Sequence, residues 1–155
     1  MKPLKQITFF LIAIVFITIA ACKKYPDGPS FSLYTKQQRL CNGWDVFSFT
    51  VNGYDSTAYL RSQPFYGKFD FLAQKGDEAA YFGYIGIGGY EGGGHWYFGS
   101  DKTTVLIEST YDSAYPGTVG PYRIGTWQWD IMRLEKKELW LKTTYNGKEY
   151  FVKFK

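Results

Sequence analysis

Apolar residues are arranged along the chain in two different ways. Residues 7–19 form an almost unbroken apolar run, and Lys2 and Lys5 precede it. From residue 44 onward, short apolar runs alternate with polar residues and are separated by turn-forming dipeptides such as Asn52-Gly53 and Asn146-Gly147. The first arrangement predicts a targeting segment, and the second predicts a series of short β-strands.

The alternating part predicts seven or eight strands joined by short turns. Thr35, with Gln38 three residues later, is typical of a capped helical turn over 35–40. Residues 56–62 fit either a short strand or a helical turn. Consecutive strands with hairpin turns, and no segment left to cover a sheet edge, favour an all-β fold, an antiparallel up-and-down β-barrel of about eight strands. The expected strands are 44–51, 66–74, 79–87, 95–99, 103–109, 122–134 (with a bulge), 138–145 and 148–154.

The apolar run near the start is followed by a processing signal. Its length of about 13 residues is too short for a helix to cross a bilayer core of roughly 30 Å. It ends at Ile19-Ala20-Ala21-Cys22, which resembles the lipobox of bacterial lipoprotein precursors. We therefore expect residues 1–21 to be a lipoprotein signal peptide, Cys22 to carry the lipid, 22–34 to be a lipidated tether, and 35–155 to be the barrel domain. The alternatives are an ordinary signal peptide and a membrane-anchor helix, with Cys22 incidental.

Composition adds little chemistry to this picture. Of the 18 basic residues two lie in the leader, which leaves 16 against 14 acidic residues. So small a net charge, with basic residues scattered along the chain, does not favour nucleic acid as a partner. Cys41 has no second cysteine to pair with and is expected to be a small buried apolar residue; a reactive thiol is the alternative.

Candidate catalytic and metal-binding groups are few. His95 is the single histidine, so neither a metal site nor a Ser-His-Asp triad has a recognisable pattern. Asp70, Glu108 and Asp130 lie on expected strands, where solvated outer-face charges are the preferred interpretation over a pair of glycosidase carboxylates. The glycines of 86–94 match no phosphate-binding spacing, and we interpret 88–94 as a loop at the barrel mouth, beside 111–121. We expect no enzyme activity, no cofactor and no metal.

Aromatic residues are unusually frequent, with five Trp, 14 Tyr and 13 Phe. Some of them must fill the core of the barrel. The remainder are expected to line a cavity for a small apolar or amphipathic ligand, or to form a platform for sugar rings. The candidate cavity residues are Tyr84, Trp96, Trp127 and Trp129. An eight-stranded barrel is about wide enough either to fill itself or to hold one small ligand, so both interpretations stay open.

Several short motifs, taken in order, resemble the lipocalin-like lipoproteins of Bacteroidetes. They include Cys22-Lys-Lys-Tyr-Pro-Asp-Gly-Pro, Trp44-Asp-Val, Val51-Asn-Gly-Tyr-Asp-Ser-Thr, His95-Trp-Tyr-Phe-Gly-Ser-Asp-Lys, and the stretch from Trp129 to Tyr150. The resemblance covers nearly the whole mature chain and implies the barrel, without implying any activity. Asn42 stands where lipocalins carry the glycine of Gly-x-Trp. Arg123 and Arg133 are the candidates for the arginine that covers this tryptophan.

These observations predict a membrane-anchored envelope lipoprotein, attached through palmitate-type lipid on Cys22 and most consistent with the outer membrane, facing the periplasm or the cell surface. Its lipocalin-like barrel is expected to bind a small apolar or amphipathic ligand. The alternative is a non-catalytic structural or interaction protein that contacts a protein or glycan through its loops.

Overall fold

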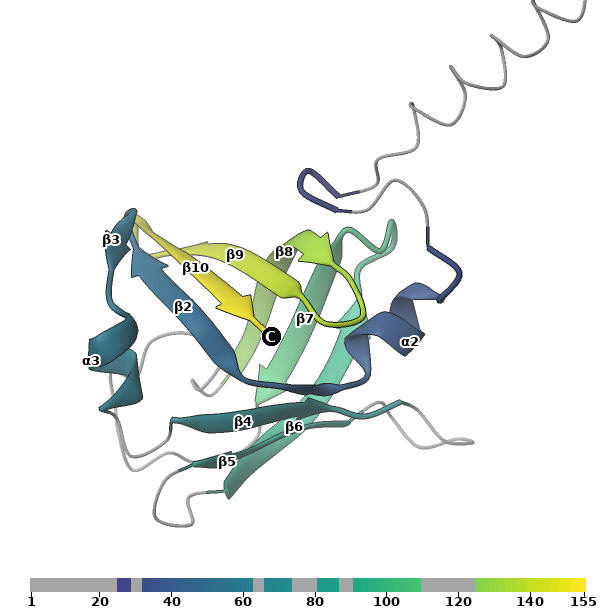
Figure 1. Cartoon of the computed structure of the whole chain (residues 1–155), viewed down its shortest axis with the longest axis horizontal. Coiled ribbons are helices and arrows are strands. Elements are labelled where there is room, and N and C mark those ends of the chain that lie inside the picture. Colours follow the sequence, from purple (N-terminus) through teal and green to yellow (C-terminus); the bar gives the residue numbers. More distant parts are fainter. Residues whose placement is uncertain (1–24, 29–31, 63–65, 74–80, 87–90, 110–124) are drawn as a thin grey trace, which may run out of the picture.

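The computed structural model describes residues 25–28, 32–62, 66–73, 81–86, 91–109 and 125–155 (Figure 1). Within these ranges the chain is mostly β. Two short helices, α2 (Lys36–Leu40) and α3 (Thr57–Arg61), accompany the strands in the described residues. The strands are β1 (Gly43–Trp44), β2 (Val46–Val51), β3 (Tyr54–Asp55), β4 (Gly67–Phe71), β5 (Tyr81–Gly86), β6 (Glu91–Phe98), β7 (Thr104–Ser109), β8 (Gly125–Leu134), β9 (Leu139–Tyr145) and β10 (Lys148–Phe154).

The ten described strands belong to one antiparallel sheet, in the order β1-β4-β5-β6-β7-β8-β9-β10-β2-β3. From β4 to β10 each strand pairs with its neighbour in the sequence, which is a meander. This confirms the predicted all-β, antiparallel fold. Eight strands have five residues or more, while β1 and β3 have two residues each.

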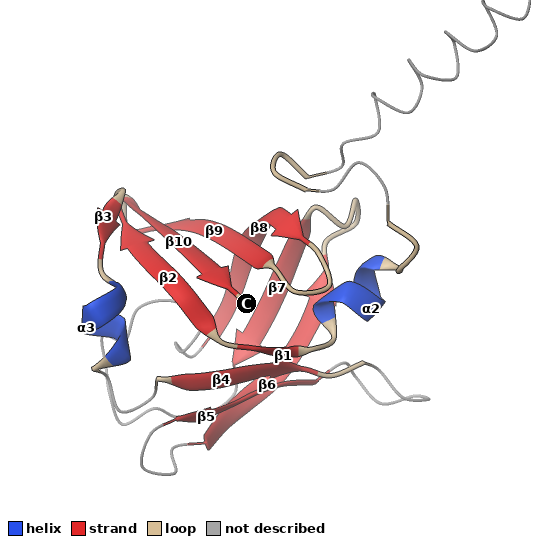
Figure 2. Ribbon diagram, viewed as in Figure 1, coloured by secondary structure: helices blue, strands red, loops and turns tan. Residues whose placement is uncertain are grey.

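The segment that contains β1 and β2 pairs with two strands that are far apart in the sequence. β1 pairs with β4 through Gly43 and Trp44, and β2 pairs with β10 (Figure 2). Asp45, the residue between them, exchanges two backbone hydrogen bonds of 2.9 Å with Lys155. The predicted strand 44–51 is therefore divided at Asp45, because its backbone changes partner from β4 to the end of β10.

Buried side chains alternate along the strands and form one core. On β4, Phe69 and Phe71 are buried while Lys68 between them is exposed. The same alternation places Trp129 and Ile131 on one face of β8, as predicted, and leaves Asp130 exposed. The strand residues of this core are Trp44, Val46, Phe49, Phe69, Phe71, Trp96, Val105, Ile107, Trp129, Ile131, Leu134, Leu139, Leu141, Tyr150, Val152 and Phe154.

The two helices form for local reasons. Thr35 and Gln38 make the predicted capping box: the Thr35 hydroxyl accepts from Gln38 N and the Gln38 side chain accepts from Thr35 N. The alternative left open at 56–62 is settled as helix α3. The Asp55 carboxylate accepts a hydrogen bond from Thr57 N at its start, and the hydrogen bonds from Thr57 hold the pKa of Asp55 below its usual value.

The expected loop over 88–94 is wrong in its second half, and the residue before Gly43 has an ordinary backbone. Residues 91–94 were expected to belong to a loop over 88–94, but they begin β6 and pair with β5, and Gly94 also pairs with β7. Glycine weakens a strand when it stands alone. Here pairing with β5, and at Gly94 with β7 as well, compensates for that weakness. Asn42, which stands where lipocalins carry a glycine, does not have a positive φ. Its amide instead donates to Lys136 O at 3.2 Å.

The remaining strand predictions hold to within a few residues. β10 matches the predicted range 148–154, and β8 contains the predicted bulge, a register shift between Ile131 and Arg133. The predicted signal peptide and Cys22 lie outside the described residues. Within the predicted tether, Tyr25 is buried and Asp27 N donates to Met132 O on β8 at 2.9 Å.

Candidate functional site

The sheet has two different ends, which we name after the helices that lie at them. The α2 end carries α2, the β6–β7 turn and the β8–β9 turn (Figure 1). The α3 end carries α3, the β2–β3 turn and the β9–β10 turn. The predicted mouth loops, 88–94 and 111–121, lie largely outside the described residues; the strand ends that flank residues 87–90 and 110–124 are at the α3 end. The two ends bury their aromatic side chains to different degrees.

The α2 end is filled by side chains. Leu40 and Trp44 have no exposed surface, and the Trp44 indole Nε1 donates to Leu40 O at 2.9 Å. Leu134 and Leu139, on either side of the β8–β9 turn, are also fully buried. Because the indole is both packed and hydrogen-bonded, this end of the interior is closed by described residues.

Aromatic side chains at the α3 end are only partly covered by described residues. Trp127, near the start of β8, and Tyr145, at the end of β9, are half-buried and pack edge to face with their ring centroids 4.5 Å apart. Val51 and Tyr66 are partly buried apolar neighbours of the same core. A partly buried apolar surface of this kind can bind a small molecule with an apolar body.

Trp96 and Trp129 belong to the packed core. Trp96 packs edge to face against Phe71 and Phe98, and its Nε1 donates to Leu72 O at 2.9 Å, toward the α2 end. Trp129 has no exposed surface. The structure thus separates Trp96, directed at β4, from Trp127, directed at β9. The side chain of Tyr84 lies outside the described residues; its backbone pairs with Phe69 and Gly92.

The interior beside Trp127 contains polar atoms. Thr143, on β9, is buried and its hydroxyl donates to Gln128 O at 2.8 Å. The Trp129 Nε1 atom is buried and has no hydrogen-bond partner among the described residues. A buried N–H without an acceptor costs about 1–3 kcal/mol, so an acceptor atom placed beside it would be favoured.

Sequence reasoning missed Tyr145, Val51 and Tyr66. Tyr145 was recognisable, because it directly precedes the Asn146-Gly147 turn and antiparallel pairing brings the end of β9 next to the start of β8. Val51 and Tyr66 gave no comparable signal, since their position depends on how β2 and the start of β4 curve in space.

The polar groups considered as catalytic or metal-binding candidates do not belong to the surface formed by Trp127 and Tyr145. Asp130 is exposed, and Asp70 and Glu108 are half-buried and alternate with core residues on their strands. Cys41 is a free, half-buried thiol whose pKa is raised by burial. The Nδ1 atom of His95 is buried without a hydrogen-bond partner in the part of the chain that the structure describes.

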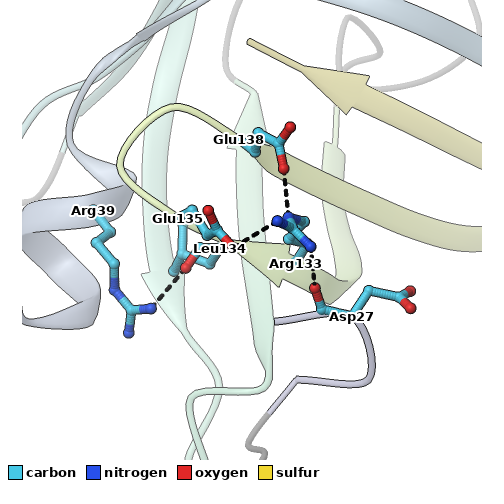
Figure 3. Close-up of polar contacts among 6 residues, drawn as sticks. All are labelled: Asp27, Arg39, Arg133, Leu134, Glu135 and Glu138. Carbon is cyan, nitrogen blue, oxygen red and sulfur yellow. Dashed lines mark hydrogen bonds and ion pairs between the residues drawn. The ribbon is translucent and has the colours of Figure 1, made fainter. Parts of the chain in front are cut away.

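A polar network at the α2 end ties the first described residues to the sheet (Figure 3). Arg39 is buried and its Nη1 donates to Leu134 O at 2.6 Å. Arg133 donates to Asp27 O at 2.8 Å and forms ion pairs with Glu135 and Glu138, of 2.6 and 2.5 Å. Its guanidinium lies over the Trp140 ring, 5.1 Å from the centroid. The resemblance suggested Arg123 or Arg133 as the arginine that covers Trp44. Arg133 contacts Trp140 instead, and Arg123 lies outside the described residues.

Tyr25 is the centre of that attachment. Its side chain is 3% exposed and its hydroxyl donates to Lys102 O at 3.0 Å, while Lys36 Nζ lies 5.1 Å from its ring centroid. Burial raises the pKa of Tyr25 from 10.0 to about 12. The neutral phenol is thus the form that the folded chain holds.

We expect this pKa to make stability depend on pH in the alkaline range. Above pH 10 the unfolded chain loses the Tyr25 proton while the folded chain keeps it until about pH 12, so the free energy of unfolding falls between these values, by about 2 kcal/mol at pH 12. Urea unfolding at pH 9 to 12 checks this, with Tyr25→Phe as the control that removes the phenol. Equal losses in both chains would show that Tyr25 is not responsible.

Two comparisons, with protein-family models and with curated proteins, find no relative of this chain. Among the described residues, neither helix has the length and apolar character to cross a bilayer.

Proposed function

We propose that this protein is a membrane-anchored lipoprotein of the bacterial envelope, held by lipid on Cys22, whose sheet closes into a lipocalin-like up-and-down barrel. In this proposal it is not an enzyme, and the α3 end of the barrel binds a small apolar or amphipathic ligand.

The barrel is supported by the pairing of the segment from Gly43 to Val51. This segment bonds to β4 at its start and to β10 along its length. A meander whose first segment pairs with both its second and its last strand has the connectivity of an up-and-down barrel. Phe154 on β10 also packs edge to face on Phe69 of β4, with ring centroids 5.5 Å apart, although these strands are not hydrogen-bonded neighbours.

The ligand site is carried by one observation: Trp127 and Tyr145, at the α3 end, are partly buried core aromatics that pack on each other. The opposite end is filled by Leu40 and Trp44, so a ligand would enter from the α3 end. Thr143 lies farther in along β9, and its hydroxyl oxygen, which donates to Gln128 O, favours a ligand with a polar atom among apolar groups.

Lipid attachment is tested by mass spectrometry of the mature chain produced in a bacterium that processes lipoproteins. We expect the N-terminal peptide to begin at Cys22 and to carry a covalent diacylglycerol or triacyl mass that survives denaturation. The Cys22→Ser variant is expected to lose that mass and to leave the membrane fraction, whereas Cys41→Ser keeps both. An N-terminal peptide without lipid in the unsubstituted chain would overturn the anchor.

Ligand binding is tested by native mass spectrometry of the same material. We expect an adduct of a few hundred daltons that dissociates on denaturation. Trp127→Ala should reduce the occupied fraction by about tenfold, because it removes an aromatic contact surface. The matched control is Trp140→Ala, since Trp140 lies on the outer face beside Arg133 and Lys153. A bare mass for the unsubstituted chain, with and without added fatty acid, would contradict the proposal.

The second candidate function is a non-catalytic envelope protein that binds a protein or glycan through its surface. It is favoured by Tyr54 and Tyr59, on β3 and α3, which are 78% and 61% exposed. Tyrosines of this exposure are typical of contact surfaces. A bare native mass combined with cross-links from position 54 to an envelope component would select this function.

A further inference from the structure

The residues that follow Cys22 do not form a free tether over their whole length. Tyr25 is buried against the sheet, Asp27 N donates to Met132 O, and Arg133 holds the Asp27 carbonyl. Tyr25 is three residues from Cys22, and three residues span at most about 10 Å. This inference rests on the lipid on Cys22, which is part of the proposed function. Such a lipid would keep Tyr25 and the α2 end within about 10 Å of the lipidated residue.

The surface around Tyr25 has the residues that a bilayer surface favours. We define the anchor-side patch as Leu33, Tyr34, Lys36, Lys102 and Lys136. Leu33 and Tyr34 are 87% and 47% exposed. Lys136 Nζ lies 4.9 Å from the Tyr34 ring centroid, while Lys36 and Lys102 lie beside Tyr25, where Lys36 Nζ donates to Lys102 O at 3.2 Å. Exposed apolar and tyrosine side chains among lysines are typical of segments that lie in the headgroup region.

The acidic residues of the same region reduce this positive charge without cancelling it. Glu135 and Glu138 both pair with Arg133. The Asp101 carboxylate accepts from Thr103 N and from the Thr103 hydroxyl, and the remaining acid is Asp27. Lys137 in the β8–β9 turn is exposed and adds a further positive charge. The basic groups exceed the acidic groups named here by one charge: five basic groups (Lys36, Lys102, Lys136, Lys137 and Arg133) face four carboxylates (Asp27, Asp101, Glu135 and Glu138).

We propose that the anchor-side patch lies against the anionic lipid headgroups of the bilayer that holds the Cys22 lipid. The domain then has a fixed orientation, with its α2 end on the membrane and the aromatic α3 end pointing away from it. The lipid and the patch act as two membrane contacts of one chain. Because Tyr25 is only three residues after Cys22, the two contacts stay close together.

The test is lysine acetylation footprinting of the intact lipidated chain, in vesicles containing phosphatidylglycerol and, as reference, in neutral detergent micelles. Lys102 and Lys136 should react roughly fivefold more slowly on the vesicles, the factor expected for one lysine at an anionic surface. Lys148, exposed at the β9–β10 turn of the α3 end, should react at the same rate in both. Vesicles of phosphatidylcholine alone should give weaker protection of the patch.

A charge-reversal variant makes the test specific. Lys36→Glu with Lys136→Glu should abolish most of the protection at Lys102, whereas Lys148→Glu should leave it unchanged; circular dichroism checks that each variant folds. The mass spectra that measure lysine acetylation also report the mass of the N-terminal peptide. A peptide without lipid would overturn the proposed anchor and this orientation with it. A lipidated peptide with equal rates at Lys102 and Lys148, or protection that requires a membrane protein, would overturn the orientation alone.

Discussion

Replacing Trp129 with alanine is expected to lower the free energy of unfolding by about 3–5 kcal/mol, the usual cost of truncating a fully buried large aromatic side chain. Trp129 lies opposite Val105 on β7 and has no exposed surface. The surrounding strands are hydrogen-bonded on both sides, so they cannot collapse into the space that the indole leaves. Urea unfolding followed by far-ultraviolet circular dichroism measures the loss without depending on tryptophan fluorescence.

The matched control is Trp140→Ala, one strand away on the opposite face. Trp140 is half-buried and contacts Arg133, Lys153 and, edge to face, Phe151. We expect this variant to lose about 1 kcal/mol, since cation–π contacts at exposed sites contribute about 0.5–1 kcal/mol each. If the two substitutions cost the same, Trp129 would not be the core residue that its burial indicates.

Truncating Phe154 to alanine is expected to cost a similar 3–5 kcal/mol, although it is the last residue of β10. Phe154 is fully buried, pairs with Val46 across a bulge that skips Phe47, and packs on Phe69 of β4. Its loss would weaken the contact between the last strand and β4 as well as the core. A large effect would therefore be informative about how the sheet is held together.

Phe151→Ala provides the comparison for Phe154. Phe151 is on the same strand, but it is half-buried and its ring meets Trp140 on the outer face, with centroids 6.2 Å apart. We expect a loss well below that of Phe154→Ala in the same urea titration. A loss at Phe154 no greater than that at Phe151 would argue that the end of β10 frays and does not connect to β4.

Much of the strand order could be predicted because its signals are local. The Asn146-Gly147 turn and the alternation on either side of it were sufficient to define β9 and β10, and the capping box was sufficient to define α2. The division at Asp45 was not predictable, because it depends on which strand the backbone meets after folding. The strand character of residues 91–94 was missed for the same reason: pairing with β5 and β7 outweighs the low strand preference of glycine.

The candidate site was predicted less well than the fold. Composition indicated that aromatic residues gather inside, but alternation along a strand says only which face a residue occupies and not what covers it. Trp127 and Trp129 share a face, yet one is half-buried and the other has no exposed surface. Trp127 lies near the start of β8, where it packs on Tyr145, whereas Trp129 lies farther along the strand, opposite Val105. The burial of Tyr25 was equally hidden, since a sequence of Pro, Gly and Lys residues resembles a linker.

The two strands at the ends of the sheet order affect how copies of the protein interact when they come close together. The strands that terminate the order, β1 and β3, have two residues each, and every longer strand of the described chain has hydrogen-bonded neighbours on both sides. Copies fixed in one plane by lipid would meet each other far more often than molecules in free solution. β1 covers β4 at Phe69 and Asp70, and β3 covers β2 at Thr50 and Val51, so a strand of another copy cannot pair at these positions. Under the proposed lipid anchoring, copies that meet in the plane of the bilayer would therefore have shortened edges for adding strand to strand.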